Sequence, residues 1–269
     1  MRSSPGLAAL RQTLSRLERV VVAFSGGVDS GLLAWTAQEV LGSERTLAVT
    51  AVSPSLAPSE HADCRSLAET WGLRWMEVLS DEGSRPEYVA NGPDRCYHCK
   101  SELMERIAPI AQAEGAVVAL GVNVDDLADH RPGQRAARER GAVFPLVEAG
   151  LTKALVRDAA RQLGLPIWDK PAAACLASRV PYGTPVTLGT LHQVAAAEEA
   201  LHALGFRALR VRHYGDLARL EFAVGDLERA FADRARIVAR VRAAGYRYVT
   251  LDLEGLRSGN LNQALVIGT

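Results

Sequence analysis

Three cysteines are spaced so that they could hold a metal centre or carry sulfur. Cys96 and Cys99 lie in the segment DRCYHCK, and Cys175 follows 76 residues later in a proline-rich segment. A two-residue gap lets two thiolates bind one metal centre, and folding has to bring the third cysteine to it. Three thiolates leave one position of a four-iron cluster open, which suits a [4Fe-4S] cluster that also holds a ligand such as sulfide.

Two other interpretations of these cysteines stay open. A structural zinc site would take its fourth ligand from His98 or His61. The pair with the two-residue gap could instead form a catalytic persulfide or a disulfide. Cys64 falls on a predicted helix among apolar neighbours, and we interpret it as a small buried thiol outside the site.

The segment SGGVDS at residues 25–30 has the composition of a phosphate-binding loop. It follows a short apolar run at residues 19–24 and precedes an apolar helical pattern, which predicts a strand-to-helix turn. Two adjacent glycines let backbone N–H groups approach a phosphate, and a helix N-terminus adds partial positive charge. The loop lacks the lysine of a Walker motif and the glycine spacing of a dinucleotide fingerprint. An ordinary turn is the competing interpretation.

SGGVDS resembles the PP-loop of the ATP pyrophosphatase superfamily, whose members cleave ATP between the α and β phosphates and transfer AMP to an acceptor oxygen. The resemblance implies that ATP is a cofactor and that Asp29 helps to place Mg²⁺. It also implies that four further loop residues hold pyrophosphate: Ser25, Gly26, Gly27 and Ser30.

Strands and helices alternate over the first part of the chain. The patterns predict strands at residues 19–24, 46–52, 74–78 and 116–120, and helices at 30–41 and 59–71, the second with Ser59 as its N-cap. Continuous apolar strands separated by helices are typical of a parallel sheet covered on both faces. We therefore predict an α/β fold with a doubly wound parallel sheet over residues 1–170, related by its PP-loop to the adenine nucleotide alpha hydrolase-like folds.

The remainder of the chain predicts a smaller C-terminal α+β domain. Residues 171–186 hold three prolines and a glycine, so we expect a linker loop that contains Cys175. Helices are then predicted at 188–204 and 226–243, paired strands at 209–213 and 217–222, and a last strand at 246–251. We expect residues 187–269 to form this domain.

Composition and charge narrow the class of partner. The 269 residues include 31 basic and 31 acidic side chains, so no overall charge attracts nucleic acid or a membrane surface. No apolar run approaches the roughly 20 residues of a membrane span, and no export signal is visible. We expect a cytoplasmic protein with reduced thiols, no membrane partner and no nucleic acid partner.

Five segments together resemble the LarE family, ATP-dependent sulfurtransferases of nickel-pincer nucleotide cofactor synthesis. They are SGGVDS, DRCYHCK, GVNVDDLADHRPG at 121–133, KPAAACLASRVPYG at 170–183 and RVRHYGDLARLE at 210–221. The resemblance implies that a carboxylate of pyridinium-3,5-biscarboxylic acid mononucleotide is adenylated and that sulfur then displaces AMP to give a thiocarboxylate. Adenylation suits this chemistry because a carboxylate is a poor electrophile until its oxygen becomes a good leaving group.

The resemblance also assigns the sulfur site to Cys175. Some family members sacrifice this cysteine and become dehydroalanine, whereas others carry two additional cysteines and relay sulfide through a four-iron cluster. Cys96 and Cys99 relate this chain to the second group. The family further implies a small-molecule nucleotide substrate, a sulfide or other sulfur donor, a C-terminal domain for substrate binding and oligomerisation, and a homo-oligomer that is expected to be a hexamer.

Two arginines and two acidic residues are candidates for the substrate's phosphate site. Arg210 and Arg212 alternate on a predicted strand and share one face, where forked hydrogen bonds could hold a phosphate. A solvated strand face is the alternative. Glu198 and Asp226 match acidic positions near that phosphate in the family, although each could be a helix-surface charge, or a cap in the case of Asp226.

Five other polar residues complete the candidate set. Asn123 and Asp126 follow a predicted strand at the carboxyl edge of the sheet, where they could contact the nucleotide or cap a helix. Lys100, Ser178 and Arg179 stand close to the cysteines in sequence. Positive charge there would stabilise thiolates and the charge that develops on the adenylate.

Three other functions share parts of these patterns. A tRNA thiolase also uses ATP and three cysteines, but the neutral charge balance and the missing basic tail disfavour it. A PP-loop amidating ligase would share the loop without needing convergent cysteines, and no glutaminase domain is visible. A nucleotide-sensing or metal-storage protein would release no pyrophosphate with any acceptor.

Overall fold

The structure is a computed structural model that describes residues 4–127, 132–171 and 174–257. The chain forms two compact units, which are described in turn. The first comprises residues 1–53, 60–82 and 96–173, and the second comprises residues 54–59, 83–95 and 174–269. Residues 128–131 and 172–173, which belong to two of the motifs quoted above, lie outside the described residues.

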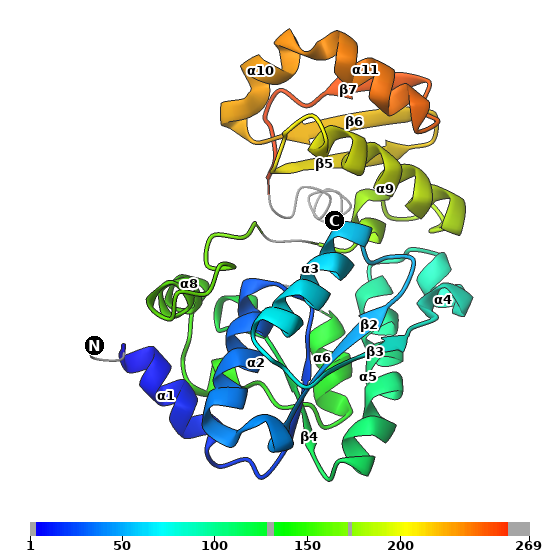
Figure 1. Ribbon diagram of the computed structural model, residues 1–269. Coiled ribbons are helices and arrows are strands. Elements are labelled where there is room, and N and C mark those ends of the chain that lie inside the picture. Colours follow the sequence, from blue (N-terminus) through cyan, green and yellow to red (C-terminus); the bar gives the residue numbers. More distant parts are fainter. Residues whose placement is uncertain (1–3, 128–131, 172–173, 258–269) are drawn as a thin grey trace. The chain divides into compact units, whose positions relative to one another are not determined.

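A parallel sheet of four strands forms the centre of the first unit (Figure 1). Its strand order is β3-β2-β1-β4. The strands are β1 (Val20–Ala23), β2 (Thr46–Val52), β3 (Trp75–Leu79) and β4 (Val117–Leu120). All four are apolar runs predicted from the sequence, and the predicted parallel arrangement is confirmed because Val20 pairs with both Thr46 and Val117.

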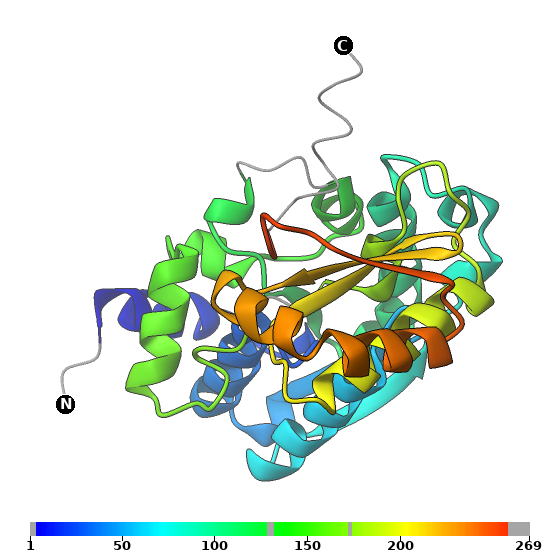
Figure 2. The ribbon, with the colours of Figure 1, turned by 90° about the horizontal axis from the view of Figure 1, so that it is seen from above.

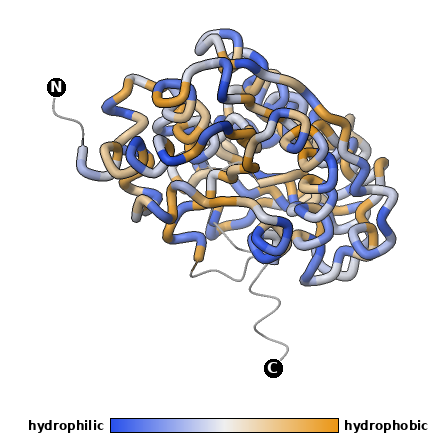
Figure 3. Tube along the Cα trace, turned by 90° about the horizontal axis from the view of Figure 1, so that it is seen from below, coloured by the Kyte–Doolittle hydropathy of each residue, from blue (hydrophilic) through white to orange (hydrophobic). Residues whose placement is uncertain are grey.

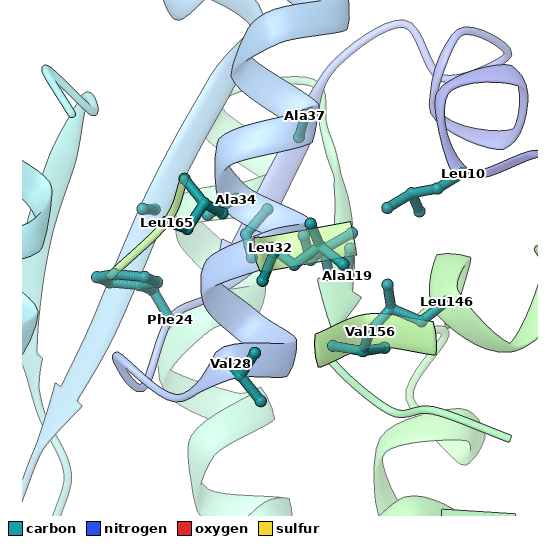
Figure 4. Packing of buried hydrophobic residues seen from close by; sticks show 14 of the residues in the cluster. Leu10, Phe24, Val28, Leu32, Ala34, Ala37, Ala119, Leu146, Val156 and Leu165 are labelled. Carbon is teal, nitrogen blue, oxygen red and sulfur yellow. The ribbon is translucent and has the colours of Figure 1, made fainter. Parts of the chain in front are cut away.

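Alternate residues of each strand feed two separate hydrophobic cores, so both faces of the sheet are covered. Val20 and Val22 point into one core and Val21 points into the other. Figure 4 shows part of the first core, in which Leu32 of α2 lies near Ala119 of β4. The helices of this face are α1 (Pro5–Leu14), α2 (Val28–Leu41), α3 (Pro58–Thr70), α7 (Pro145–Glu148) and α8 (Lys153–Gln162).

The opposite face packs against two helices, α5 (Arg95–Ala113) and α6 (Pro132–Glu139). The chain leaves β1 toward β2 and β3 and later returns to β4 on the other side of β1. Ligands of open α/β sheets bind at such a reversal, beyond the carboxyl ends of the strands. The loops that follow β1 and β4 therefore frame the expected site.

The second unit contains a three-stranded sheet of order β5-β6-β7. The two runs predicted as paired strands do pair: β5 and β6 are antiparallel, and β7 is parallel to β6. One face carries a core formed with three helices, two of which lie along the sheet in Figure 2 (orange). The elements are α9 (Leu188–His202), β5 (Leu209–Tyr214), β6 (Leu217–Phe222), α10 (Leu227–Ala232), α11 (Arg234–Ala243) and β7 (Tyr248–Leu251).

Short helical turns complete the structure. The α-helix among them is α4 (Pro86–Val89), and the 3₁₀ turns are η1 (Ser43–Arg45), η2 (Glu82–Ser84), η3 (Asp125–Leu127), η4 (Leu176–Arg179) and η5 (Val224–Asp226). Hydrophobic and hydrophilic stretches alternate along the trace in Figure 3. Among the described residues, no helix combines the length and the apolar character required to cross a membrane.

Two local predictions are wrong. Ser59 is not an N-cap, because α3 already begins at Pro58; proline suits a first helical position, where its missing N–H costs nothing. The single helix predicted at 226–243 is two helices that meet at Asp233. The backbone there has ψ 9°, and aspartate favours helix ends because its side chain competes for backbone hydrogen bonds.

Candidate active site

The loop between β1 and α2 is closed by its two serines. The Ser25 N–H donates to Ser30 Oγ at 3.1 Å, and the two hydroxyl oxygens are also 3.1 Å apart. Ser30 Oγ in turn donates to the Gly27 carbonyl at 3.3 Å. Gly27 is the N-cap of α2 and supplies no side-chain cap to the first N–H groups. Such N–H groups are available to a phosphate.

Gly26 allows the loop to turn tightly over a buried thiol. Its φ of 65° favours glycine. A Cβ at this position would lie 3.0 Å from Cys64 Sγ, so α3 packs directly against the loop. Burial raises the pKa of the Cys64 thiol to about 11, although a hydrogen bond with Thr50 opposes the shift. The thiol is therefore protonated at neutral pH and acts as a packing group, in line with our sequence interpretation.

The end of β4 presses on the same loop. A Cβ on Gly121, the residue after β4, would lie 2.6 Å from the Ser30 backbone nitrogen and 2.9 Å from the Asp29 carbonyl carbon. Both are backbone atoms, which cannot swing aside as a flexible side chain can. Gly121 therefore sets how closely the first turn of α2 approaches β4.

Three segments converge on the carboxylate of Asp29. Asn123 Nδ2, from the loop after β4, donates to Asp29 Oδ1 at 3.1 Å. Lys153 Nζ, from the first position of α8, donates to Asp29 Oδ2. Asp125 Oδ2 accepts the Lys153 N–H at 2.8 Å and so fixes the start of α8. The sheet edge thus places an acid, an amide and a cation beside the loop.

Lys153 was missed by the sequence analysis, although one signal was present. Thr152 caps α8, and Lys153 follows at the first helical position without an acidic residue in the first turn. A cation is disfavoured at a helix N-terminus, which carries partial positive charge. A lysine there indicates a nearby anion, and Asp29 supplies one.

Asp126 and Asn123 also bond to each other. Asp126 Oδ2 accepts the Asn123 N–H at 3.1 Å, and Asn123 Oδ1 accepts the Asp126 N–H at 3.3 Å. This reciprocal pair closes the turn that leads into η3. Asn123 is buried and reaches the loop, whereas the Asp126 carbonyl accepts a hydrogen bond from Gln134 Nε2 of α6 at 3.0 Å.

Lys170 ties the loop to α3. Its Nζ donates to the Gly26 carbonyl at 3.3 Å and forms ion pairs with Glu60 at 2.9 Å and Asp63 at 2.7 Å. Burial lowers the pKa of Lys170, but the hydrogen bonds with Asp63 and Glu60 outweigh it and the net pKa is raised. Lys170 is therefore a permanent cation beneath the loop, and no sequence pattern indicated that role.

Cys96, Cys99 and Lys100 occupy the first turns of α5. Cys96 is exposed and Cys99 is partly exposed, and residues three apart on a helix are neighbours on its surface. A Cβ on Gly133 of α6 would lie 2.9 Å from the Cys96 carbonyl oxygen, so α6 packs directly on this turn. Tyr97 adds a hydrogen bond of 2.6 Å to Glu139 of α6.

Cys175 lies in the second unit, exposed, at the start of η4. Buried Arg179 holds this turn: its Nη1 donates to the Ala174 carbonyl at 2.5 Å and the Cys175 carbonyl at 3.1 Å. Arg179 Nη1 also contacts Ser178 Oγ at 3.1 Å. The other edge of the guanidinium forms a two-point ion pair with Glu198, at 2.8 and 3.0 Å.

Two arginines of β5 lie beside this group. Arg212 is 2% exposed and donates to the Ser178 carbonyl at 2.8 Å and to Glu221 at 2.9 Å. Its Nε is buried without a partner among the described residues. Burial lowers the pKa of Arg210, and the positive charges of Arg179 and Arg212 lower it further. The cluster therefore has unneutralised positive charge that an anion would stabilise.

The acidic candidates differ in their surroundings. Glu198 Oε1 accepts the Val211 N–H at 2.9 Å in addition to its bonds with Arg179, so this carboxylate joins α9, η4 and β5. Asp226 lies where η5 meets α10, and its N–H donates to the Ala223 carbonyl at 2.8 Å. It provides no side-chain cap to α10.

No metal-binding group is assembled among the described residues: no three His, Cys, Asp or Glu side chains there lie in an arrangement that could hold an ion. Cys96 and Cys99 belong to the first unit and Cys175 to the second. None of the four cysteines, all of which are described, is in a disulfide. His61, one alternative zinc ligand, pairs its Nε2 with Glu77 at 2.9 Å.

Comparisons with known proteins show which proteins this chain is similar to. A family model described as NAD synthase matches residues 8–82, which span β1, the loop and β3. The pyridinium-3,5-bisthiocarboxylic acid mononucleotide synthase of Lactiplantibacillus plantarum is 39% identical over 259 residues, 96% of this chain and 94% of that protein. An uncharacterised Synechocystis protein is 45% identical over 262 residues, 96% of this chain and 97% of that protein. An uncharacterised Methanocaldococcus jannaschii protein is 27% identical over 242 residues, 90% of this chain and 92% of its own length.

Proposed function

Since the chain belongs to the LarE family of ATP-dependent sulfurtransferases, we propose that it acts on pyridinium-3,5-biscarboxylic acid mononucleotide in nickel-pincer nucleotide cofactor synthesis. A substrate carboxylate oxygen attacks the α-phosphorus of ATP, and pyrophosphate leaves. A sulfur nucleophile then attacks the activated carbonyl carbon, and AMP leaves. The observation that carries the proposal is the convergence of Asp29, Asn123 and Lys153 beside a PP-loop.

In this proposal the first unit binds ATP and Mg²⁺. The N–H groups at the start of α2 face the phosphates. Asp29 already accepts bonds on both oxygens, but a carboxylate has about four lone-pair sites, so one oxygen can also bind Mg²⁺. We assign Lys153 to the charge that develops on the departing pyrophosphate, because its ammonium group lies beside Asp29 at the loop and a fixed cation there would lower the barrier.

We further propose that Arg210 and Arg212 bind the phosphate of the mononucleotide. The Arg212 Nε has no partner among the residues that the structure describes, and the arginines repel one another, which supports an anion at this point. Glu198 takes a supporting part, because its carboxylate is engaged with Arg179 and the Val211 N–H. Asp226 stays a candidate that could bind a metal near the phosphate.

Cys175 is our proposed sulfur site, and its exposure makes the thiol accessible to a small substrate. We also propose that Cys96, Cys99 and Cys175 hold a [4Fe-4S] cluster. Three thiolates are a suitable donor set, and a bound cluster would supply an open iron position for sulfide. Lys100 and Arg179 add positive charge next to these cysteines in the chain. We propose that the protein is a cytoplasmic homo-oligomer. Its expected hexameric mass can be measured by sedimentation.

The activity is tested with purified protein, ATP, Mg²⁺, a sulfide source and the pyridinium mononucleotide. Mass spectrometry should detect the replacement of a carboxylate oxygen by sulfur, together with pyrophosphate. Asp29→Ala should abolish both products, whereas Asp158→Ala, which removes a carboxylate from the exposed side of α8, should not. Pyrophosphate release that depends on tRNA or ammonia, and not on the pyridinium compound, would refute the proposal.

The route of sulfur is tested on the same samples. An intact Cys175 after turnover indicates relay, and conversion to dehydroalanine indicates sacrifice. Anaerobic reconstitution with iron and sulfide should give a four-iron chromophore that is lost in Cys96→Ala, Cys99→Ala and Cys175→Ala and kept in Cys64→Ala. Tight stoichiometric zinc binding without iron uptake would contradict the cluster.

A further inference from the structure

A buried asparagine outside every candidate set holds the segment that carries Cys175. Asn91 is 0% exposed and has a φ of 56°. Its amide nitrogen donates to the carbonyls of Val180 at 3.3 Å, Pro181 at 2.8 Å and Thr184 at 2.8 Å. Asparagine is among the few non-glycine residues that tolerate this backbone region, and an amide is the group that can face several carbonyls as a donor.

Arg95 extends the same contact to the cysteine turn. It is 4% exposed, and its Nη1 donates to Asn91 Oδ1 at 2.5 Å and to the Ala177 carbonyl at 2.8 Å. Its guanidinium also lies 5.8 Å from the centre of the Tyr182 ring. Asn91 and Arg95 thus form a continuous set of hydrogen bonds, which starts at the Thr184 carbonyl and ends at the Ala177 carbonyl, two residues after Cys175.

Backbone hydrogen bonds also hold the segment that carries Cys175. The Gly183 N–H donates to the Asn91 carbonyl at 3.1 Å, and the Val186 N–H donates to the Val89 carbonyl at 2.9 Å. At the other end of the segment, the Leu176 N–H donates to the Ser55 carbonyl at 2.9 Å. Residues 176–186 are therefore held along their length by the segments 54–59 and 83–95 of the same unit.

The carbonyls around Cys175 are held by buried guanidinium groups. The Ala174 and Cys175 carbonyls accept from Arg179 at 2.5 and 3.1 Å. The Ala177 carbonyl accepts from Arg95 at 2.8 Å, and the Ser178 carbonyl accepts from Arg212 at 2.8 Å. Arg179 and Arg212 belong to the proposed substrate side. Arg95 is the first residue of α5 and directly precedes Cys96.

We propose that Asn91 and Arg95 are positioning residues that keep the Cys175 turn in one conformation, so that its exposed thiol stays in place for sulfur transfer. This inference rests on the proposed function of Cys175. η4 has four residues, and a 3₁₀ turn of that length has little stability of its own. A misplacement of about 1 Å at a reacting group can cost about 100-fold in rate.

Asn91→Asp tests the proposal with almost no change in shape. The substitution replaces an NH₂ donor with a carboxylate oxygen that faces three carbonyl oxygens. In single-turnover experiments, we expect thiocarboxylate formation to slow by about 100-fold, while the preceding acceptor-dependent release of pyrophosphate stays within about 3-fold of wild type. Arg95→Met should act in the same direction, and Arg95→Lys should recover part of the loss. Arg95→Met also serves if Asn91→Asp does not fold.

Hydrogen exchange gives a readout independent of activity. In Asn91→Asp, exchange should accelerate at residues 174–186 and remain unchanged in β1 and α2. The control is Tyr246→Phe, which removes a hydroxyl 3.1 Å from His213 Nδ1 in the core of the same unit without touching the cysteine turn. It should accelerate exchange in its own core only.

The outcomes separate the two proposals. Uniformly faster exchange with equal losses of pyrophosphate and thiocarboxylate would overturn the positioning role, as would wild-type sulfur transfer in both Asn91→Asp and Arg95→Met. If wild-type protein forms no thiocarboxylate, the proposed function fails, and the exchange pattern alone decides whether Asn91 and Arg95 hold the turn.

Discussion

Replacing Gly121 with alanine should disable the nucleotide loop by displacing its backbone, without altering any side chain that we propose binds the nucleotide. Gly121 has no positive φ that would strain an alanine, so the effect comes from space alone. The new Cβ would lie 2.6 Å from the Ser30 nitrogen and 2.9 Å from the Ser30 Cα. Ordinary contact begins near 3.4 Å, so the first turn of α2 has to retreat by about 0.8 Å.

This displacement sets the expected magnitudes. Overpacking by one methyl group lowers the free energy of unfolding by about 1–3 kcal/mol. Alanine offsets about 0.4–1 kcal/mol of this loss, because it lowers the conformational entropy of the unfolded chain. The net loss of about 0–2.6 kcal/mol should lower Tm by at most about 10 °C for a chain of this size. A shift approaching 1 Å at the loop that orients the phosphates should slow adenylation by about 100-fold.

The assay is acceptor-dependent pyrophosphate release at saturating ATP, with Tm measured by thermal unfolding. Gly83→Ala is the matched control, because a Cβ at Gly83 meets nothing within 4 Å and its φ is also not positive. It should retain wild-type activity. Gly121→Ala with wild-type turnover and an unchanged KM for ATP would refute the view that β4 sets the position of the loop.

Three further predictions follow from the same geometry. Lys153→Met should slow pyrophosphate release by about 5- to 1000-fold, since a cation about 4 Å from developing charge contributes about 1–4 kcal/mol, and Lys153→Arg should restore part of it in the same assay. Because burial raises the pKa of Cys64 to about 11, the thiol is protonated in both states below its ordinary pKa of 9.0, and above that pH the unfolded state ionises first. Denaturant titrations should therefore show stability falling from pH 9 toward 11, and Cys64→Ala should remove that component. Gly133→Ala, whose Cβ would meet the Cys96 carbonyl at 2.9 Å, should reduce iron uptake in reconstitution while leaving ATP binding measured by calorimetry unchanged.

The sequence predicted most of the framework because local patterns encode it. The run at residues 46–52 became β2 with the same bounds, and the parallel sheet followed from apolar strands separated by helices. The glycine-rich segment at residues 25–30 was predicted at a strand-to-helix turn, and it lies between β1 and α2. The LarE resemblance is confirmed by the synthase that shares 39% identity across 96% of the chain.

The contacts that complete the sites are separated in sequence, and for that reason no local pattern indicated them. Lys153 pairs with Asp29 across 124 residues, and Lys170 reaches the Gly26 carbonyl across 144. Periodicity reports which face of an element is buried, but it does not report which distant charge meets it. The break at Asp233 was missed for a related reason, since one aspartate inside a helical pattern is compatible with either a surface residue or a cap.

Lys153, which sequence reasoning missed, pairs with a side chain, the Asp29 carboxylate, but the other residues that it missed contact backbone atoms. Gly121 abuts the Ser30 nitrogen, Lys170 and Asn91 donate to carbonyls, and Arg95 donates to the Ala177 carbonyl. A sequence motif indicates which side chains contact a ligand. The backbone that carries those side chains has the same chemical groups at every position, so contacts to it leave no pattern in the sequence. Groups that hold it can therefore be identified only from the fold. In this protein they lie beneath the nucleotide loop and around the Cys175 turn, the two segments whose position the proposed chemistry depends on.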